Sequence, residues 1–410
     1  MPGRQDGIEA GFLRHGSARA VQAGLALAGT LAVLVAVLLP RIPAVWHMHL
    51  ISPGWLPHQL VKLLEDSNDI QVALLSERNP APHPRIALVL ITEDTLAELP
   101  YVTPIDRSLV ARLIKGLDDL GARAIGLDML FDQATEARKD DALWERFKLT
   151  RAALVLGGAD ERTPLSARRR AWQTAFLDKV GRPFGFFNLR YDVREAAQTH
   201  VIRNRAEAAA GSIFTMSFAE AVARQVGIGQ MPESRRIAWL RPPSQGGDAF
   251  VSIDADAVLA ASAEPDGVLA RALEEQISGR IVLVGADLLG RDRHPTPLSV
   301  VDQGDMLGVA VHAQVLAALI DGRTLGDLDP VQASALAATA TLLGALIGWF
   351  AARRRMILTL LIGCGTLAIV GLSAFMLWQL RVIVPVAALV ASLVGAVMVA
   401  RLVRAYGTRA

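Results

Sequence analysis

The chain has 410 residues, a formal net charge of +2 and a single cysteine, Cys364. The length permits more than one domain, and the balanced charge excludes the basic surface that is typical of nucleic-acid binding. One cysteine excludes a disulfide framework or a cysteine-based zinc site within the chain. Because 52% of the residues are hydrophobic and the mean hydropathy is positive, the composition favours membrane segments.

Four uncharged apolar segments are each long enough to cross about 30 Å of hydrocarbon as a helix. They predict transmembrane helices at residues 21–39, 333–351, 356–378 and 382–400. The first segment is longer than the apolar core of a usual signal peptide, and no clear small-x-small cleavage site follows it. We interpret it as an uncleaved anchor, with a cleaved signal peptide as the alternative.

Arginine clusters flank these segments and predict their orientation, because short cytoplasmic loops are rich in Lys and Arg. The clusters are Arg4, Arg14 and Arg19, then Arg353, Arg354 and Arg355, then Arg401, Arg404 and Arg409. With four spans, all three clusters fall on the cytoplasmic side. We therefore predict a multi-pass inner (plasma) membrane protein in contact with lipid. Its N-terminus (1–20) and tail (401–410) are cytoplasmic, and its large domain (41–329) is extracytoplasmic, or periplasmic.

Glycines recur in the apolar segments and allow helices to approach closely. We expect packing within one chain, with a homo-oligomer as the alternative. After the first span, the segment 43–60 carries Trp46 and Trp55 among three histidines, His47, His49 and His58. Tryptophans at a membrane boundary explain this composition more simply than a metal site does.

The large domain alternates short β-type runs with helical patterns, beginning with a strand, a helix and a second strand at 85–91, 108–121 and 122–131. Such a unit implies a parallel strand pair. Further strands are predicted at 152–158, 183–190, 236–243 and 280–287, and further helices around 141–147, at 166–172, at 212–227 and at 308–323. The pattern predicts a three-layer α/β domain with a mostly parallel sheet.

Acidic residues come at or near the ends of three predicted strands: Asp94, Asp128 and Asp287. Ligands in open parallel sheets bind beyond the carboxyl ends of the strands, so these residues are expected to converge there. Three neighbouring carboxylates require a cation, a basic partner or raised pKa values. Arg107 and Arg293 are the candidate basic partners.

Structural explanations compete with ligand binding at several of these positions. Asp94 and Asp106 each precede a helical pattern and suit an N-cap, as do Asp254 and Asp256 in the segment 252–261. Arg107 is then expected to pair with Asp94 or Asp128.

The loop after the last predicted strand and the helix that follows it hold three more candidate residues. Asp292 lies in this polar loop, where Thr296 precedes Pro297 and is expected to fix the loop conformation. His312 lies among apolar residues of the closing helix, as a packing histidine would.

Four sequence blocks carry a resemblance to a known family. They are "IALVLITEDTL", "PIDRSLVARLIKGLDDLGARAIGLDMLF", "GRIVLVGADLLGRDRHPTPL" and "GVAVHAQVLAALIDGR". In order and spacing they resemble the CHASE type-2 (CHASE2) domain over about residues 45–325. That domain is a sensory module found outside the membrane in bacterial cyclases and histidine kinases, and three spans usually follow it.

The resemblance implies a membrane-anchored sensor or regulatory subunit. The candidate ligand-binding residues are Asp94, Arg107, Asp128, Asp287, Asp292, Thr296 and His312. The sequence departs from the family where "YVTPID" lacks the family's Trp. Only residues 401–410 follow the last span, where family members commonly continue into a signalling domain. We therefore expect the protein to act through a separate membrane or envelope protein partner.

Catalytic motifs are missing from the sequence: it has no G-x-S-x-G, H-E-x-x-H or G-x-x-x-x-G-K-[ST]. We expect neither an enzyme nor a bound cofactor or metal. Two alternatives remain. One is an assembly subunit of an envelope complex without a small ligand, and the other is an extracytoplasmic hydrolase with a metal on Asp128, Asp287 and Asp292.

Overall fold

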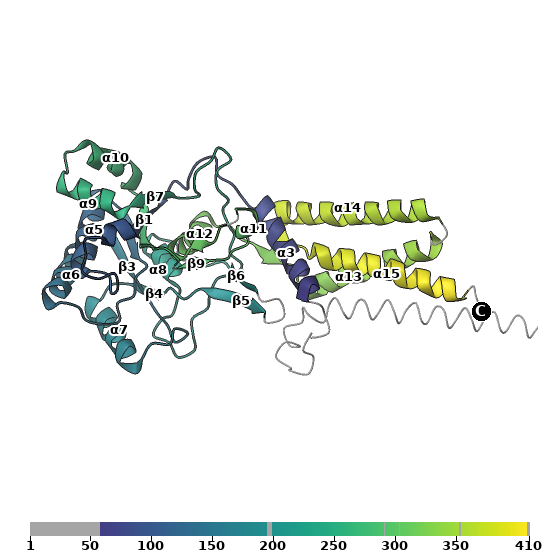
Figure 1. The fold of residues 1–410 in the computed structure, drawn as a ribbon, viewed down its shortest axis with the longest axis horizontal. Coiled ribbons are helices and arrows are strands. Elements are labelled where there is room, and N and C mark those ends of the chain that lie inside the picture. Colours follow the sequence, from purple (N-terminus) through teal and green to yellow (C-terminus); the bar gives the residue numbers. More distant parts are fainter. Residues whose placement is uncertain (1–57, 195–198, 291, 303, 352–353, 408–410) are drawn as a thin grey trace, which may run out of the picture. The chain divides into compact units, whose positions relative to one another are not determined.

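The computed structural model describes residues 58–407, except for 195–198, 291, 303 and 352–353. The described residues form two compact units: an α/β domain, Val72–Val193 with Thr199–Leu325, and a helical unit that contains Gly326 onwards (Figure 1). The predicted first span at 21–39 and most of the segment 43–60 lie outside the described residues.

The α/β domain is built on six strands that are paired only in parallel. In space their order is β4-β3-β2-β8-β1-β7. Their bounds are β1 Ile86–Thr92, β2 Ala124–Leu127, β3 Ala153–Gly158, β4 Phe184–Phe186, β7 Val251–Asp254 and β8 Ile281–Asp287. Strand β8 is the last of these in the chain but lies between β1 and β2, so Leu283 is in register with both Leu88 and Gly126.

Helices cover both faces of this sheet, as the near-continuous apolar strands require. Helices α5 (Arg107–Asp119), α6 (Ala137–Leu149), α9 (Ala255–Ala263) and α10 (Val268–Ile277) share a core with Val89 and Val284. The opposite face packs against α8 (Phe218–Gln225) and α12 (Gly308–Asp321). There, a Cβ on Gly126 or Gly285 would lie closer than 3.0 Å to Phe218 or Val309. Helix α7 (Ala167–Val180) contributes Phe176 and Leu177 to the first core, so the predicted three-layer α/β fold is confirmed (Figure 1).

One predicted strand is wrong. The apolar run 236–243 forms only isolated bridges, at Arg236 and Arg241. The backbone of Leu240 is instead bound by the side chain of buried Gln314, which accepts from its N–H at 2.7 Å and donates to its carbonyl at 2.8 Å. A side chain on α12 therefore takes the place of a neighbouring strand.

Other elements differ in extent from the predictions or were not predicted. The strand predicted at 122–131 is shorter in the structure and forms only β2. The helix predicted at 212–227 is also shorter and forms α8, because Ser217 starts it with a capping box to Glu220. The unpredicted elements include α3 (His58–Leu75), β7, α10, and the pair β5 (Arg190–Arg194) and β6 (Thr199–Asn204).

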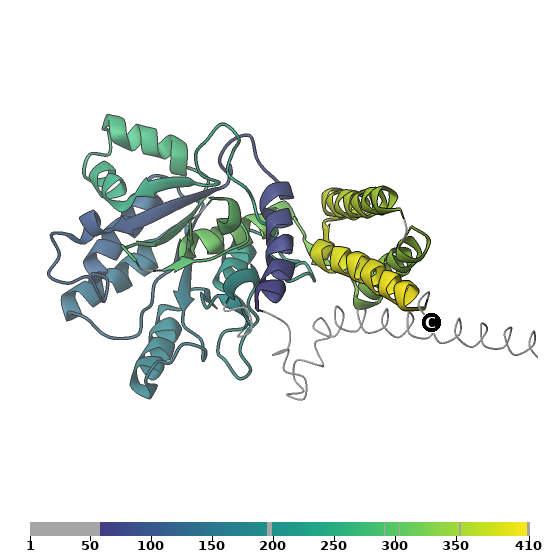
Figure 2. The ribbon, with the colours of Figure 1, turned by 45° about the vertical axis from the view of Figure 1, so that its right-hand side comes forward.

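The helical unit contains three helices that are long and apolar enough to cross a membrane: α13 (Pro330–Phe350), α14 (Arg355–Leu380) and α15 (Val386–Gly407) (Figure 2). They correspond to three of the four predicted spans. The last one begins later than predicted because Val382–Ile383 forms a short strand, β12, paired with β11 (Gly326–Asp327). Asp329 caps α13 by accepting from the Val331 N–H at 2.8 Å.

Helices α13 and α15 approach each other closely at two glycines. A Cβ on Gly344 or Gly348 would lie closer than 3.0 Å to the carbonyl oxygen of Leu393 or Val397. These two glycines have GxxxG spacing, which favours close helix packing. The expected packing within one chain is found at both positions.

Candidate functional site

Polar residues gather at the carboxyl ends of β1, β2 and β8. Asp128 directly follows β2, and its N–H donates to the carbonyl of Val284 in β8 at 2.8 Å. Asp287 ends β8 in register with Thr92 of β1. The chain then forms β9 (Arg293–His294), α11 (Ser299–Asp302) and β10 (Met306–Leu307), which pairs antiparallel with β9, before α12 begins.

A cavity of about 370 Å³ opens between these elements. Most of its wall is apolar and includes Leu88, Leu90, Leu240, Pro242, Phe250, Leu298, Met306 and Leu307. Its polar lining includes Asp248, Ser252, Asp287, Arg293, Thr296, Ser299 and Gln314. A mainly apolar cavity with a few polar groups is typical of small-molecule sites.

Asp287 and Arg293 form an ion pair at this cavity. The guanidinium Nη2 lies 2.6 Å from the carboxylate Oδ1, and the side chains are 30% and 45% exposed. Arg293 is thus the basic partner of Asp287, as expected from the sequence. A pair this exposed stabilises the fold by only about 0–1 kcal/mol.

Three further polar residues of the cavity, Thr296, Ser299 and Gln314, are bound to the protein itself. Thr296 is buried, and its N–H donates to Ser299 Oγ at 3.1 Å. This contact orders the start of α11, in agreement with the expected structural role of the Thr296-Pro297 turn. The amide of Gln314 is used by Leu240.

A second cluster involves His294, the neighbour of Arg293 in β9. His294 Nε2 lies 2.9 Å from Asp292 Oδ1, and its Nδ1 lies 2.6 Å from Tyr191 Oη. Asp292 has the left-handed backbone angle φ 52°. Its carboxylate packs on Gly308, where a Cβ would lie closer than 3.0 Å to it.

Two groups near Asp292, the half-buried Asp128 and the buried His312, are held in their neutral forms. Burial, and then the negative charge of Asp292, raises the pKa of Asp128 to about 8. Burial lowers the pKa of His312 to about 4, and the His312 ring packs edge-on against Phe218 with centroids 5.4 Å apart. Asp128, Asp292 and His312 are therefore close enough to interact, and the raised pKa considered for the strand-end acids is found at Asp128.

Asp94 differs from its prediction. It is exposed within the short helix α4 (Glu93–Leu96), whose N-cap is Thr92, one residue before the helix. Thr92 accepts from the N–H of Thr95 at 3.3 Å, and Glu93 accepts from the N–H of Leu289 in the loop after β8. The predicted Asp94 cap is thus wrong, because the hydroxyl at the end of β1 is better placed.

Arg107 also has partners other than those expected. Its guanidinium lies 3.8 Å from Asp140, donates to the carbonyl of Gln133 at 3.3 Å, and stacks 4.6 Å from the centroid of the Phe131 ring. These partners come from α6 and the segment before it, not from Asp94 or Asp128.

Asp106, the residue before Arg107, caps α5 as predicted by accepting from the N–H groups of Ser108 and Leu109. Burial opposes ionisation of its carboxyl, but hydrogen bonds from Lys139 and Ser108 lower the pKa of Asp106 to about 2. Asp106 and Arg107 thus belong to an ion-pair network that holds α5 against α6.

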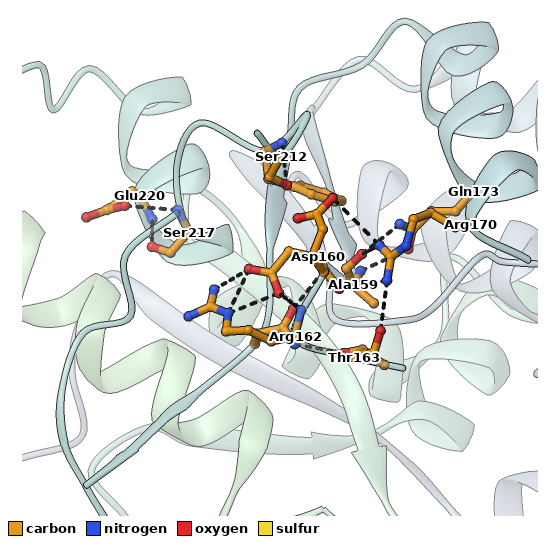
Figure 3. A network of polar contacts seen from close by, with 12 residues as sticks. Ala159, Asp160, Arg162, Thr163, Arg170, Gln173, Ser212, Ser217 and Glu220 are labelled. Carbon is orange, nitrogen blue, oxygen red and sulfur yellow. Dashed lines mark hydrogen bonds and ion pairs between the residues drawn. The ribbon is translucent and has the colours of Figure 1, made fainter. Parts of the chain in front are cut away.

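A polar network at the end of β3 was not predicted from the sequence (Figure 3). Asp160 is fully buried and accepts from the N–H and the guanidinium Nε of Arg162, each at 3.0 Å. Arg170 donates to the carbonyls of Asp160 and Thr163, and the Gln173 amide binds both backbone groups of Ala159. The signal in the sequence was an acid directly after a strand, followed by a basic helix.

The three-carboxylate metal centre of the hydrolase alternative is not assembled. Asp287 is paired with Arg293 at the cavity, while Asp128 and Asp292 belong to the cluster around His294. Within the ranges that the structure describes, no three His, Cys, Asp or Glu side chains are arranged to hold a metal ion.

The fold and its apolar helices define a membrane protein with a large α/β domain. The family model of the CHASE2 domain matches residues 42–352, so the chain belongs to the CHASE2 domain family. Comparison with curated proteins and with solved structures gave no match. CHASE2 domains are sensory and not catalytic, and with the apolar helices this indicates a membrane sensor.

Proposed function

We propose that this protein is an extracytoplasmic sensor that binds a small molecule in the cavity at the end of β8. The cavity is the observation that carries the proposal, because its 370 Å³ lies within the range of ligand sites, about 300–1,000 Å³. Leu88 and Leu90 of β1 and Ser252 of β7 line it from within their strands, and Asp287 brings the carboxyl end of β8, where ligands bind in open parallel sheets, into its wall. Because the chain belongs to a sensory domain family, a ligand cavity without catalytic residues suits its function.

The position of α12 supports a route from the cavity to the membrane. Leu307 and Ala310, at the start of α12, line the cavity, and the chain runs from the end of α12 to α13 within ten residues. A ligand shifts such a connection only if it binds one conformation more tightly than the other. We propose that the helices pass this shift to a separate partner protein.

The proposed orientation places the domain (41–329) outside the inner membrane and both termini in the cytoplasm. Its support is the positive-inside pattern, with Arg354 and Arg355 at the start of α14 and Arg401 and Arg404 in the last turns of α15. Arg168 is exposed and suits a test: a single cysteine there (R168C, C364S) is expected to react with a membrane-impermeant maleimide in intact cells. Labelling only after lysis of the inner membrane would contradict the orientation.

The assembly alternative also has an observation in its favour. Leu289 follows β8, and Val300 and Val301 belong to α11, whose Ser299 lines the cavity. The apolar side chains of all three are exposed. Such side chains suit contact with another protein. We expect Ala310→Phe, which fills the cavity, to abolish the sensory response while co-purifying proteins remain. Val300→Asp with Val301→Asp is the matched surface variant. Loss of the complex with this variant, and an unchanged response with Ala310→Phe, would favour assembly.

A further inference from the structure

We infer that the ligand of this cavity is a small zwitterion with an apolar side chain, of the chemical class of the free apolar α-amino acids. The inference rests on the proposed function, because it specifies what the proposed cavity binds. It follows from the charges, the geometry and the apolar wall of the site.

The charges at the cavity wall favour a ligand with one positive and one negative group. Asp287 and Arg293 are each other's partner, with 2.6 Å between Oδ1 and Nη2, and both are partly exposed. A partly exposed ion pair is weak and opens easily. When it opens, a ligand ammonium binds Asp287 and a ligand carboxylate binds Arg293, so all four charges are paired.

A ligand with one charge satisfies only half of this arrangement. A simple anion pairs with Arg293 but brings a second negative charge next to Asp287, and exposed Asp248 adds a third. A simple cation pairs with Asp287 and leaves Arg293 facing a like charge. Like charges at such short distance oppose binding, and a charged group left without a partner in a cavity does so as well.

The spacing of the pair favours the α-amino acid class over larger zwitterions. The two protein charges are in direct contact before the ligand binds. A ligand that inserts between them needs its own opposite charges close together, as they are on one α-carbon. Charge-assisted hydrogen bonds from Arg to a carboxylate are short and directional, which strengthens this selection.

The rest of the cavity accepts an apolar side chain. Its wall includes Leu88, Leu90, Phe250 and Met306. Two buried polar side chains of the lining already have partners: the Gln314 amide binds the backbone of Leu240, and Thr296 Oγ1 lies 3.4 Å from Ser299 Oγ. A polar ligand side chain would therefore lose its bonds to water against this wall, whereas an apolar one gains from burial.

The test uses the full chain in lipid nanodiscs, titrated by calorimetry with leucine, isoleucine, valine, methionine and phenylalanine. Two analogues of leucine are 4-methylpentanoate, which has no ammonium, and 3-methylbutylamine, which has no carboxylate. We expect at least one of the five amino acids to bind, and each analogue to bind at least about tenfold more weakly than leucine. Asp287→Asn and Arg293→Gln are each expected to weaken amino-acid binding at least about tenfold.

Matched controls separate this inference from the proposed function. Lys115 and Asp119 form an ion pair of similar exposure on α5, with 2.5 Å between Nζ and Oδ2, so K115Q/D119N is expected to leave binding unchanged. Each variant is checked for unchanged circular dichroism and unfolding temperature.

Several results would overturn the inference. It is wrong if none of the five amino acids binds, if a singly charged analogue binds as tightly as leucine, or if D287N and R293Q bind amino acids normally. If uncharged compounds then bind and Ala310→Phe removes that binding, the cavity remains a ligand site and only the ligand class fails. If a broad screen finds no compound whose binding depends on Ala310, the proposed function fails as well.

Discussion

The same tripeptide, Gly-Ala-Asp, occurs at the ends of two strands of the sheet, and its aspartate has different surroundings in each place. At the end of β3 it is residues 158–160, and at the end of β8 it is residues 285–287. Asp160 is fully buried in a network that binds its carboxylate and the backbone around it, whereas Asp287 is 30% exposed at a cavity with Arg293 as its ion-pair partner. An acidic residue at a strand end is therefore a candidate ligand-binding residue only where its carboxylate stays accessible to a ligand.

The chain that follows each tripeptide explains this difference. Arg162 comes two residues after Asp160, and Arg170 of α7 adds a second guanidinium to the same corner. Arg293 comes six residues after Asp287, and both side chains line the cavity. The residues that follow β3 therefore enclose Asp160, whereas those that follow β8 leave Asp287 exposed at the cavity. We call the surroundings of Asp160 the closed corner and those of Asp287 the open corner.

The largest effect on stability is expected at the closed corner. Asp160→Ala removes the acceptor for the N–H and the guanidinium of Arg162 at a fully buried carboxylate, so the free energy of unfolding is expected to fall by about 2–4 kcal/mol. Denaturant unfolding of the full chain in detergent, followed by tryptophan fluorescence, measures this fall. Asp287→Ala is the matched substitution, and an equal loss in both variants would contradict the comparison.

A smaller loss is expected from Gly308→Ala, at the start of α12. The added methyl group would overlap the carboxylate of Asp292, which costs about 1–3 kcal/mol of unfolding free energy. Gly229→Ala is the control, because a Cβ there meets no atom within 4 Å. Combining Gly308→Ala with Asp292→Ala is expected to restore part of the loss. Additive losses in the double variant would show that the two residues do not meet.

The neutral pair Asp128 and His312 is expected to give the domain an unusual pH dependence. Between about pH 4 and 6.5 the folded protein holds a proton on Asp128, and the unfolded chain holds one on His312, so the two effects cancel. Between about pH 6.5 and 8 only the folded state keeps its proton. Stability then falls as the pH rises, by up to ~1.4 kcal/mol per pH unit.

Two variants separate these opposing effects. Asp128→Asn is expected to remove the fall above pH 6.5 and to reveal the effect of His312, so that stability falls as the pH is lowered from 6.5 to 4. His312→Gln leaves Asp128 alone, and stability is expected to fall as the pH rises from 4 to 8. Urea unfolding at half-unit pH steps measures both slopes. Identical profiles for wild type and both variants would contradict the assignment of neutral forms.

The smallest effect on stability is expected at the open corner. Arg293→Gln breaks a partly exposed ion pair and is expected to lower the free energy of unfolding by less than about 1 kcal/mol. The same unfolding experiment measures it, with Lys115→Gln as a surface control. A loss as large as that of Asp160→Ala would show that Arg293 supports the fold and would remove the contrast between the two corners.

The sequence predicted those parts of the structure that depend on local pattern. Strand–helix–strand alternation predicted the parallel sheet, and the spacing of Asp106 before an amphipathic helix predicted its cap. The partners of Arg107 and the fate of 236–243 depend on residues distant in the chain, Asp140 and Gln314, which no local pattern identifies. The cavity likewise arises from β1, β7, β8 and α12 together. Of its lining, the sequence singled out Asp287, Arg293 and Thr296 but not the apolar wall.

Strand β9 has only two residues, and their side chains serve different surroundings. Arg293 binds Asp287 at the cavity, and His294 contacts Asp292 and Tyr191. A ligand that pulls on Arg293 also moves the peptide that carries His294. Occupancy of the cavity would then also change the contacts that His294 makes with Asp292 and Tyr191. One peptide bond would connect the proposed ligand site to this second cluster.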